Sequence, residues 1–434
     1  MPWDALPLIS FSREINYLQG IYMSYPRNLA YFLNRLSGYS RNTLQLYPST
    51  PQNSVRSSSL IRILLPPNTI VDMRSFCFNF FGSTNASTGN AGFPKHIETI
   101  FDSVSIEVNG ETITPATNLT NHVFKFLADY HLRDRQVARG ILQNGVSALT
   151  DGTDKQGRQF SVDNWVGFLS TCMPSHIDTS ILGDVYVVIR LAQPSVLALD
   201  ATAIAASATA DYSITNLNAT VDTVSFDDGA TYYNFVNELL SHQNLEIPFE
   251  YWVSFQSSPT SLPATITATL NTGSLNMLVG TVVNGVTTGS NLEPISTSDY
   301  FQRGSPLITS VQTYVNNIQY PQFPVLPYQS YKQTLKALSL NEDVVGQLDD
   351  CFQYGGSNAP LGFWQNYAFA HATRFNHPVA SDERVISGMD TRGTQGSIRF
   401  QINGSGGSNI VPLLLANCTG VLNVGAYRSI SVAR

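Results

Sequence analysis

Apolar and polar residues alternate with a period of two along much of this chain, which is the pattern of half-buried β-strands. In residues 75–80 three phenylalanines alternate with Ser, Cys and Asn, and in residues 103–108 valine and isoleucine alternate with Ser and Glu. The second run ends in Asn109-Gly110, a strong signal for a tight turn between two strands. Further strand candidates of similar character are 60–65, 184–191, 214–226, 248–256, 266–270, 277–283, 310–317, 397–402 and 421–432.

Helical periodicity is confined to short segments. Apolar residues recur at helix-like spacing in 121–137, 232–240 and 330–340. The aromatic-rich N-terminal region is expected to be an arm, with one further helix candidate at 27–36. Long connecting segments rich in Ala, Ser, Thr, Gly or Asn, which suit contacts at the ends of β barrels, are 201–211, 256–263 and 280–296. The fold class is therefore all-β with a few short helices.

The two halves of the chain resemble each other weakly at a spacing of about 200 to 213 residues. Residues 103–110 have a counterpart in residues 310–317, and each run ends in a pair of residues suited to positive φ. We expect two sets of residues to occupy the same barrel strand in their respective halves: Val104, Ile106 and Val108, and Val311, Thr313 and Val315. Further landmarks recur in the same order: Thr114-Pro115 and Pro321-Gln322, Trp165 and Trp364, and Asp178-Thr179 and Asp390-Thr391.

This ordered recurrence indicates two similar domains in tandem rather than a solenoid, whose units run to about 20 to 50 residues. The size and strand content of each half fit a jelly-roll barrel of about eight strands. We therefore predict an N-terminal arm in residues 1–57, a first jelly roll in residues 58–200 and a second jelly roll with long loops in residues 201–434.

Composition bears on how such a protein works. Of the 434 residues 43% are hydrophobic, an ordinary share, but only 13% are charged, about half the usual share. A polar surface with few charges costs little to desolvate against a partner protein, although a secreted or extracellular β protein can have the same composition. The net charge of −7 does not indicate the basic field on which nucleic-acid binding by counterion release depends.

Cysteine usage indicates where the chain folds. Cys77, Cys172, Cys351 and Cys418 are far apart and none has the spacing of a metal site, so we expect free thiols and folding in the interior of a cell. Cys77 and Cys418 have the surroundings of small buried residues. We expect no secretory leader, because Asp4 stands where a basic segment is needed. We expect no spanning helix, because no run of about 18 apolar residues exists.

The sequence offers no convergent catalytic, cofactor-binding or metal-binding set. We expect the histidines to pack in the core or to lie at the surface, rather than to bind a metal or act as a general base. They are His96, His122, His131, His176, His242, His371 and His377. The acidic pairs 342–343 and 349–350 fit solvated turns better than a glycosidase pair, and residues 404–408 fit a flexible loop better than a phosphate cradle. We consider two interpretations of Arg133, Arg135 and Arg139. They lie at a solvated helix end, or they contact nucleic acid or a neighbouring subunit. We predict no enzyme activity and no cofactor.

Three stretches carry a resemblance to a known family: 101–110, 165–169 followed by 183–185, and 387–393. In these stretches the chain resembles the double jelly-roll major capsid proteins of the adenovirus, tectivirus and polinton-like virus lineage. The resemblance implies a homotrimer whose six barrels give a capsomer of nearly hexagonal outline, and an icosahedral shell built from such capsomers. It also implies contacts with penton and minor capsid proteins, and with an inner membrane or the genome through the N-terminal arm.

The function we predict is that of a major capsid protein, made inside the host cell, located in the virion and acting by burial of its flanks against copies of itself. The alternative is a viral spike or lectin-like protein that binds a receptor or a carbohydrate, and a β-sandwich hydrolase is a further alternative. A lectin would favour aromatic platforms and calcium-binding loops, whereas the long loops here are rich in Ala, Ser and Thr. We expect no small-molecule substrate.

Overall fold

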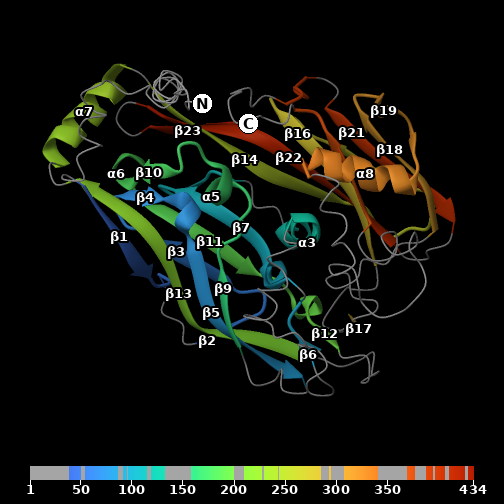
Figure 1. The fold of residues 1–434 in the computed structure, drawn as a ribbon, viewed down its shortest axis with the longest axis horizontal. Helices are drawn as coiled ribbons and strands as arrows, with labels where there is room; N and C mark the ends of the chain where they lie inside the picture. Colours follow the sequence, from blue (N-terminus) through green and yellow to red (C-terminus); the bar gives the residue numbers. More distant parts are fainter. Residues whose placement is uncertain are drawn as a thin grey trace, which may run out of the picture.

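The computed structural model describes two β sandwiches that lie side by side (Figure 1). The described residues are 39–49, 54–86, 91–94, 96–114, 119–131, 158–199, 210–226, 229–242, 244–284, 293–294, 307–340, 369–376, 388–393, 396–405, 410–425 and 429–434. Strands dominate both sandwiches, as the period-two pattern predicts. The all-β prediction with a few short helices is therefore confirmed.

The first sandwich is formed by two facing sheets. Its larger sheet consists of β1 (Tyr39–Leu46), β2 (Ser54–Arg56), β4 (Ile70–Asp72), β5 (Cys77–Ala86), β9 (Arg158–Val162), β10 (His176–Asp178) and β13 (Ala210–Phe226). The long strand β13 is central and pairs with β1, β2, β4 and β5. The smaller sheet has the order β3-β11-β7-β8, with β3 (Leu60–Leu64), β7 (Phe101–Val108), β8 (Glu111–Thr112) and β11 (Val185–Leu191).

The second sandwich repeats this plan. One sheet has the order β14-β22-β16-β20, with β23 also paired to β22; its strands are β14 (Leu245–Gln256), β16 (Leu275–Asn284), β20 (Ala370–Arg374), β22 (Ile410–Val424) and β23 (Ile430–Ala433). The other has the order β15-β21-β18-β19, with β15 (Ala264–Thr269), β18 (Leu307–Val315), β19 (Ile318–Val325) and β21 (Ser397–Ser405). A separate small sheet joins β6 (Ala91–Gly92), β12 (Ala198–Leu199) and β17 (Glu293–Pro294).

The topology and register of the two sandwiches agree. The order β3-β11-β7-β8 in one corresponds strand for strand to β15-β21-β18-β19 in the other. Ile106 pairs with Val187 as Thr313 pairs with Phe400. In the larger sheets, β13 lies between β1 and β5 as β22 lies between β14 and β16. The predicted equivalence of the strands that contain Ile106 and Thr313 is therefore confirmed.

A buried threonine makes the same hydrogen bonds in both sandwiches. The Thr179 hydroxyl is shared between two carbonyl oxygens at 2.7 and 2.9 Å and accepts a bond from the Thr69 N–H at 3.1 Å. The Thr391 hydroxyl is shared between two carbonyl oxygens at 2.9 and 3.2 Å and accepts from the Thr272 N–H at 3.2 Å. The Asp-Thr landmark read from the sequence therefore marks one structural device used twice.

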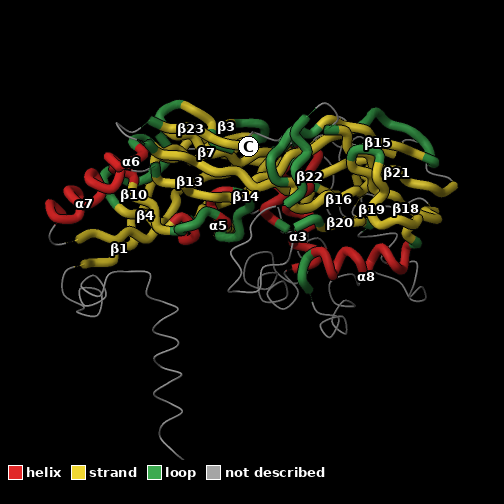
Figure 2. The backbone as a smooth tube through the Cα atoms, turned by 90° about the horizontal axis from the view of Figure 1, so that it is seen from above, coloured by secondary structure: helices red, strands yellow, loops and turns green. Residues whose placement is uncertain are grey.

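Helices are short, as expected, and two of them cover a sheet. Among the described residues the α-helices are α3 (Thr120–His131), α5 (Phe168–Thr171), α6 (Thr179–Leu182), α7 (Gly229–His242) and α8 (Pro327–Ala337), and the 3-10 helices are η1 (Met73–Ser75), η2 (Ile97–Ile100) and η5 (Pro194–Val196). Side chains of α3 and α8 form one cluster with Trp252, Val279 and Leu415 of the second sandwich. Figure 2 shows α8 lying along this face. Because both faces of β22 are thus covered, its residues 410–418 are all buried instead of alternating.

Aromatic residues fill the core of the first sandwich. Phe76, Phe78 and Phe80 are each at most 1% exposed, as their alternation with polar residues predicts. Trp165 packs on Phe76, with ring centroids 5.5 Å apart, and its indole N–H donates to the Phe76 carbonyl at 2.8 Å. The indole therefore adds apolar burial without leaving an unpaired donor.

Three expected elements differ from the structure. Residues 421–432, expected as one strand, are divided between β22 and β23, because the Gly425 N–H turns back to the Ser429 carbonyl at 2.8 Å. Pro321, expected in a turn, lies within β19, which is the edge strand of its sheet and so has no ladder bond on its outer side to lose. Residues 280–283 fall both in the strand candidate 277–283 and in the expected loop 280–296; they belong to strand β16, which extends to Asn284, so the loop begins later than expected.

The expected domain boundaries also differ from the strand pairing. Residues 39–56, placed in the arm, contribute β1 and β2 to the first sandwich, and residues 210–226, placed in the second roll, form its central strand β13. The reason is topological, since the last strand of this fold pairs with the first strand across a long stretch of chain. We therefore propose a boundary within α7, the helix that connects the two sandwiches.

Several expectations lie outside the described residues. These are the helix candidate 27–36, the loop 201–209, Trp364, and the part of the helix candidate 121–137 that follows α3.

Candidate functional site

A serine–histidine pair lies within hydrogen-bond distance but is sealed inside the second sandwich. The Ser330 hydroxyl is 2.9 Å from His371 Nδ1, and the Thr373 hydroxyl is 3.2 Å from His371 Nε2. His371 is 0% exposed, and burial lowers its pKa from 6.5 to about 4. Both ring nitrogens are bound and no solvent reaches them, so this pair serves to join α8 to β20.

The remaining candidates for chemistry do not converge. His96 and His122 are buried, whereas His176 is half exposed and lies 4.0 Å from Asp72. Within the described part of the chain, no three His, Cys, Asp or Glu side chains gather closely enough to hold a metal ion. Candidates that lie outside the described residues are His377, the acidic pairs 342–343 and 349–350, residues 406–408, and Arg133, Arg135 and Arg139.

The described cysteines are free, as the sequence predicts. Cys172 and Cys418 are buried, and desolvation raises the pKa of each thiol to about 12. Cys77 is only half buried, contrary to expectation, because it points to the outer face of its sheet, where its sulfur lies 3.0 Å from the Ser161 hydroxyl. Cys351 lies outside the described residues. None of the helices in the described ranges has the length and hydrophobicity to cross a membrane.

A cavity between the two sandwiches is too small for a substrate. Its volume is about 20 Å³, which is room for about one water molecule. Val104 and Phe168 line it from the first sandwich, and Tyr251 and Trp252 line it from the second. The rings of Phe168 and Phe249 pack edge to face beside it, with centroids 5.2 Å apart. The space is therefore a packing defect at a largely apolar contact.

That contact covers the edge of strand β14. The Met173 N–H donates to the Pro248 carbonyl at 3.0 Å, and the Glu250 N–H donates to the Thr171 hydroxyl at 2.8 Å. Thr171 is the last residue of α5 and Met173 lies two residues after it, so both belong to the first sandwich. The polar backbone of this edge strand is thus satisfied by the neighbouring sandwich instead of by water.

Strand β1 has the equivalent place in the first sandwich, but it is exposed. Seven of its eight residues are exposed and the eighth is half buried, and among the described residues its only strand partner is β13. Large apolar side chains project around it. We call this group the β1 patch; its members, exposed to between 37% and 65%, are Tyr39, Leu44, Tyr47, Phe226 and Tyr233.

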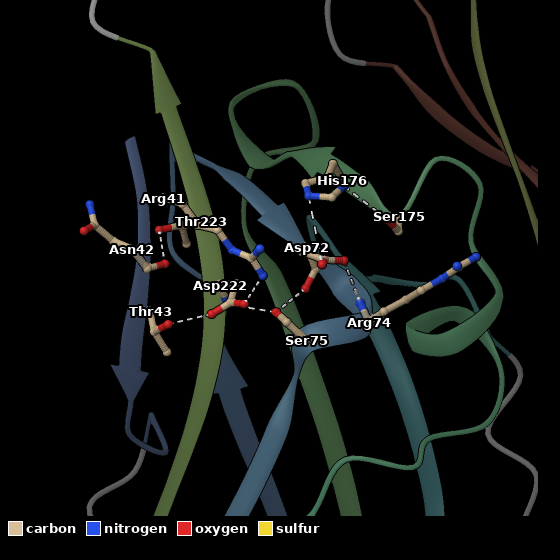
Figure 3. A network of polar contacts seen from close by, with 10 residues as sticks. All are labelled: Arg41, Asn42, Thr43, Asp72, Arg74, Ser75, Ser175, His176, Asp222 and Thr223. Carbon is tan, nitrogen blue, oxygen red and sulfur yellow. Dashed lines mark hydrogen bonds and ion pairs between the residues drawn. The ribbon is translucent and has the colours of Figure 1, made fainter. Parts of the chain in front are cut away.

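A polar network holds β1 in position (Figure 3). The Asp222 carboxylate on β13 accepts from the Thr43 hydroxyl at 2.6 Å and from the Arg41 guanidinium at 2.5 Å. Both bonds lower the pKa of Asp222, and the bond from Thr43 has the larger effect. The Asp222 N–H donates to the Ser75 hydroxyl at 2.8 Å, which in turn donates to the Asp72 carbonyl at 2.6 Å. An exposed strand fixed in this way presents a constant surface.

A second apolar group lies at the other end of the molecule, on β19 and the residue that follows it. Ile318, Phe323 and Leu326 are 54%, 47% and 39% exposed, and we call them the β19 patch. Figures 1 and 2 both place β1 and β19 at opposite ends of the long axis. Exposed apolar groups mark an interaction site where they form a contiguous patch.

Sequence reasoning missed both patches. It placed β1 in an arm and β19 in a turn, because neither segment has a clear apolar–polar alternation. The sequence contains only a general signal, its low share of charged residues, which is typical of surfaces that form interfaces but does not locate either patch.

Solved structures share this fold. No family model and no curated protein sequence matches the chain. The crystal structure of VP54 from PBCV-1, fitted into a reconstruction of the virophage Sputnik, has a TM-score of 0.57 at 14% identity and covers 92% of this chain and 98% of that chain. The Faustovirus major capsid protein has a TM-score of 0.55 at 8% identity, over 88% of this chain and 90% of that chain. A cryo-EM structure of Sputnik has a TM-score of 0.54 at 11% identity, over 91% of this chain and 88% of that chain.

Likeness at these identities establishes the fold. The chain is a double jelly roll, as predicted, and its structural neighbours include the major capsid protein of Faustovirus.

Proposed function

We propose that this chain is a major capsid protein that trimerises into capsomers of nearly hexagonal outline, which build an icosahedral shell. The observation that carries the proposal is the presence of two topologically equivalent sandwiches in one chain. Three such chains supply six similar barrels, and a ring of six similar sides can tile a surface. Closed cyclic assemblies of this kind are the usual outcome when like chains bind one another.

The surface supports a role in assembly. Obligate interfaces bury about 2,000 Å² or more and are more apolar than the rest of a protein surface. This chain has few charged residues to desolvate, at 13% of the sequence, and it carries an apolar patch at each end of its long axis. The proposal therefore asks the chain to bury surface against its own copies.

We also propose that the chain is not an enzyme. Its Ser330–His371 pair is inaccessible, with His371 fully buried. Its cavity between the sandwiches has a volume of about 20 Å³, less than a small ligand needs by more than tenfold.

Partners beyond the chain itself are proposed from the family resemblance. They are penton and minor capsid proteins at the edges of the capsomer, and the genome or an inner membrane through the N-terminal region. The proposed location is the virion, after synthesis and folding inside the host cell.

Size-exclusion chromatography with light scattering tests the central claim. The purified chain should elute with the mass of three chains, and negative-stain images of that peak should have a nearly hexagonal outline. A monomer at micromolar concentration, above all one that binds a glycan array, would contradict the proposal and favour a receptor-binding or carbohydrate-binding protein.

A further inference from the structure

We propose that Asn109 is a site of covalent modification, where the side-chain amide is lost and an aspartate or isoaspartate forms, and that two hydrogen bonds restrain this reaction in the folded chain. The inference goes beyond the proposed function and does not depend on it. It starts from the dipeptide Asn109-Gly110, in the turn between β7 and β8.

The surroundings of this dipeptide distinguish it from others of the same composition. The chain has four Asn-Gly dipeptides, at 109–110, 144–145, 284–285 and 403–404. Two of them lie wholly within the described residues. Residues 403–404 belong to strand β21 and are half buried, whereas residues 109–110 form a turn and are exposed to water.

The chemistry of the reaction needs only these two residues and water. The backbone nitrogen of Gly110 attacks Cγ of Asn109, the bond from Cγ to Nδ2 breaks, and ammonia leaves with the proton from that nitrogen. The product is a five-membered succinimide. Water then opens the ring at either carbonyl, which gives the aspartate or the isoaspartate. Glycine favours the attack because it has no side chain to shield its nitrogen.

In the folded chain the Asn109 amide is held at both ends. Its Nδ2 donates to the Leu182 carbonyl at 2.7 Å, and its Oδ1 accepts from the Asp184 N–H at 3.2 Å. We call these two bonds the Asn109 clasp. Rotation of the side chain towards the Gly110 nitrogen breaks both bonds, so the clasp opposes the attack.

Gly183 makes the clasp possible. A Cβ at this position would lie 2.3 Å from Asn109 Oδ1, so a larger residue leaves no room for the amide. Gly183 also has a φ of +84°, a backbone conformation that glycine adopts readily and L side chains rarely do. The segment 182–184 is therefore shaped to receive this one side chain.

The equivalent turn of the second sandwich lacks the clasp. Asn316 and Asn317, between β18 and β19, have positive φ as Asn109 and Gly110 do. The Asn316 N–H donates to the Ser397 carbonyl at 2.8 Å, as the Asn109 N–H donates to a carbonyl of the segment 182–184 at 3.0 Å. Among the described residues, however, Asn316 Oδ1 has no hydrogen-bond partner. The two turns share a backbone and differ in the clasp, so its effect can be tested apart from that of the turn.

Modification would open the clasp irreversibly. A carboxylate has no hydrogen to donate, so the bond to the Leu182 carbonyl is lost and a negative charge is placed beside that oxygen. An isoaspartate also lengthens the main chain at the turn and shifts β8 relative to β7. The end of β8 receives Arg434, which donates to the carbonyls of Thr112 and Ile113 at 3.2 and 2.9 Å. A shifted β8 therefore disturbs a contact between the two sandwiches.

Peptide mapping by mass spectrometry measures the reaction at each site. The full-length protein is incubated in mildly alkaline buffer, in its native state and unfolded in guanidinium. Two hydrogen bonds of ordinary net strength keep the clasp closed by about 30 to 1, so Asn109 should react about 30-fold more slowly in the native protein. Equal rates in the two states would overturn the protection, and no reaction at Asn109 in the unfolded chain would overturn the modification site itself.

Two variants exchange the reactive dipeptide between the equivalent turns. Asn317→Gly gives Asn316 a glycine neighbour without a clasp, so Asn316 should react faster than Asn109 in the same native molecules. If it reacts no faster, the turn rather than the clasp protects Asn109, and the clasp is refuted. Gly110→Asn should suppress the reaction at Asn109 in the unfolded chain, because the attacking nitrogen is then shielded. Circular dichroism establishes that both variants fold, and the wild-type comparison decides alone if they do not.

A matched pair of variants tests the consequence. Asn109→Asp introduces the product at the clasp, and Asn317→Asp makes the same change in the equivalent turn without one. The first variant should have a lower melting temperature than the wild type, and the second should melt close to the wild type. Equal melting temperatures for the two variants would mean that the clasp holds nothing in place. None of these measurements reports the oligomeric state, so the proposed function is tested separately.

Discussion

Lowering the pH should destabilise the second sandwich through His371. In the folded protein burial lowers the pKa of His371 from 6.5 to about 4, so the unfolded chain binds a proton more readily than the folded chain does. Stability that is present above pH 6.5 is therefore lost as the pH falls, and the loss levels off near pH 4. The difference in pKa corresponds to about 3 kcal/mol in the free energy of unfolding, or about 1.4 kcal/mol for each pH unit within this window.

Urea denaturation of the wild type and of His371→Gln, at equal protein concentration and at several pH values between 7 and 4, measures this effect. The variant loses some stability at neutral pH, because Ser330 and Thr373 lose their partner, but its free energy of unfolding should fall less steeply with acid. The pKa of carboxylates such as Asp222 is lowered in the folded state, so acid also removes their contribution to stability. This loss is the same in both proteins and cancels when their free energies of unfolding are compared. Parallel pH profiles for the two proteins would refute the assignment to His371.

Three further predictions concern the repeated fold. Thr179→Val and Thr391→Val should each cost about 2 kcal/mol in unfolding free energy, because each removes the hydroxyl that bonds one N–H, partly buried in Thr69 and buried in Thr272, and two carbonyls. A loss of stability in only one of the two variants would mean that the two turns are not equivalent. Gly280→Ala should cost about 1 to 3 kcal/mol, because a Cβ there would lie 2.3 Å from the Phe400 ring, and Phe400→Leu in the same chain should recover part of the loss in a thermal melt. Cys172, with its pKa near 12, should resist iodoacetamide in the folded protein and react after unfolding, as followed by peptide mass spectrometry; rapid labelling of the native protein would contradict its burial.

The sequence was sufficient to predict the strands whose one face is buried. In 75–80 and 103–108 the alternation of apolar and polar residues is a direct record of a core on one side and a polar environment on the other. The sequence was also sufficient to predict the duplication. Recurring landmarks such as Asp178-Thr179 mark positions where side chains hydrogen-bond the backbone and so fix its course. What the hydroxyl of Thr179 does could not be read from the sequence.

Elements without a one-sided environment were missed or misplaced. Strand β1 is exposed on both faces, so no alternation marks it. Strand β13 is separated from its partners β1, β2, β4 and β5 by the intervening strands β6 to β12, so proximity in sequence gave the wrong domain. His371 belongs to a short strand, Ala370–Arg374, in which nothing indicates complete burial; that depends on α8, some 40 residues earlier in the chain. The two apolar patches were beyond sequence reasoning because they are defined by exposure, which only the packed structure determines.

Proline in strand β19 limits the way in which this edge can be used. Pro321 and Pro324 carry no N–H, so the strand can offer side chains to another molecule but cannot extend a continuous hydrogen-bond ladder to it. Free chains at high concentration are thereby protected from open-ended growth into fibrous aggregates through this edge. A molecule that binds this edge must therefore be folded and match its side chains in shape, because strand addition along the backbone is blocked.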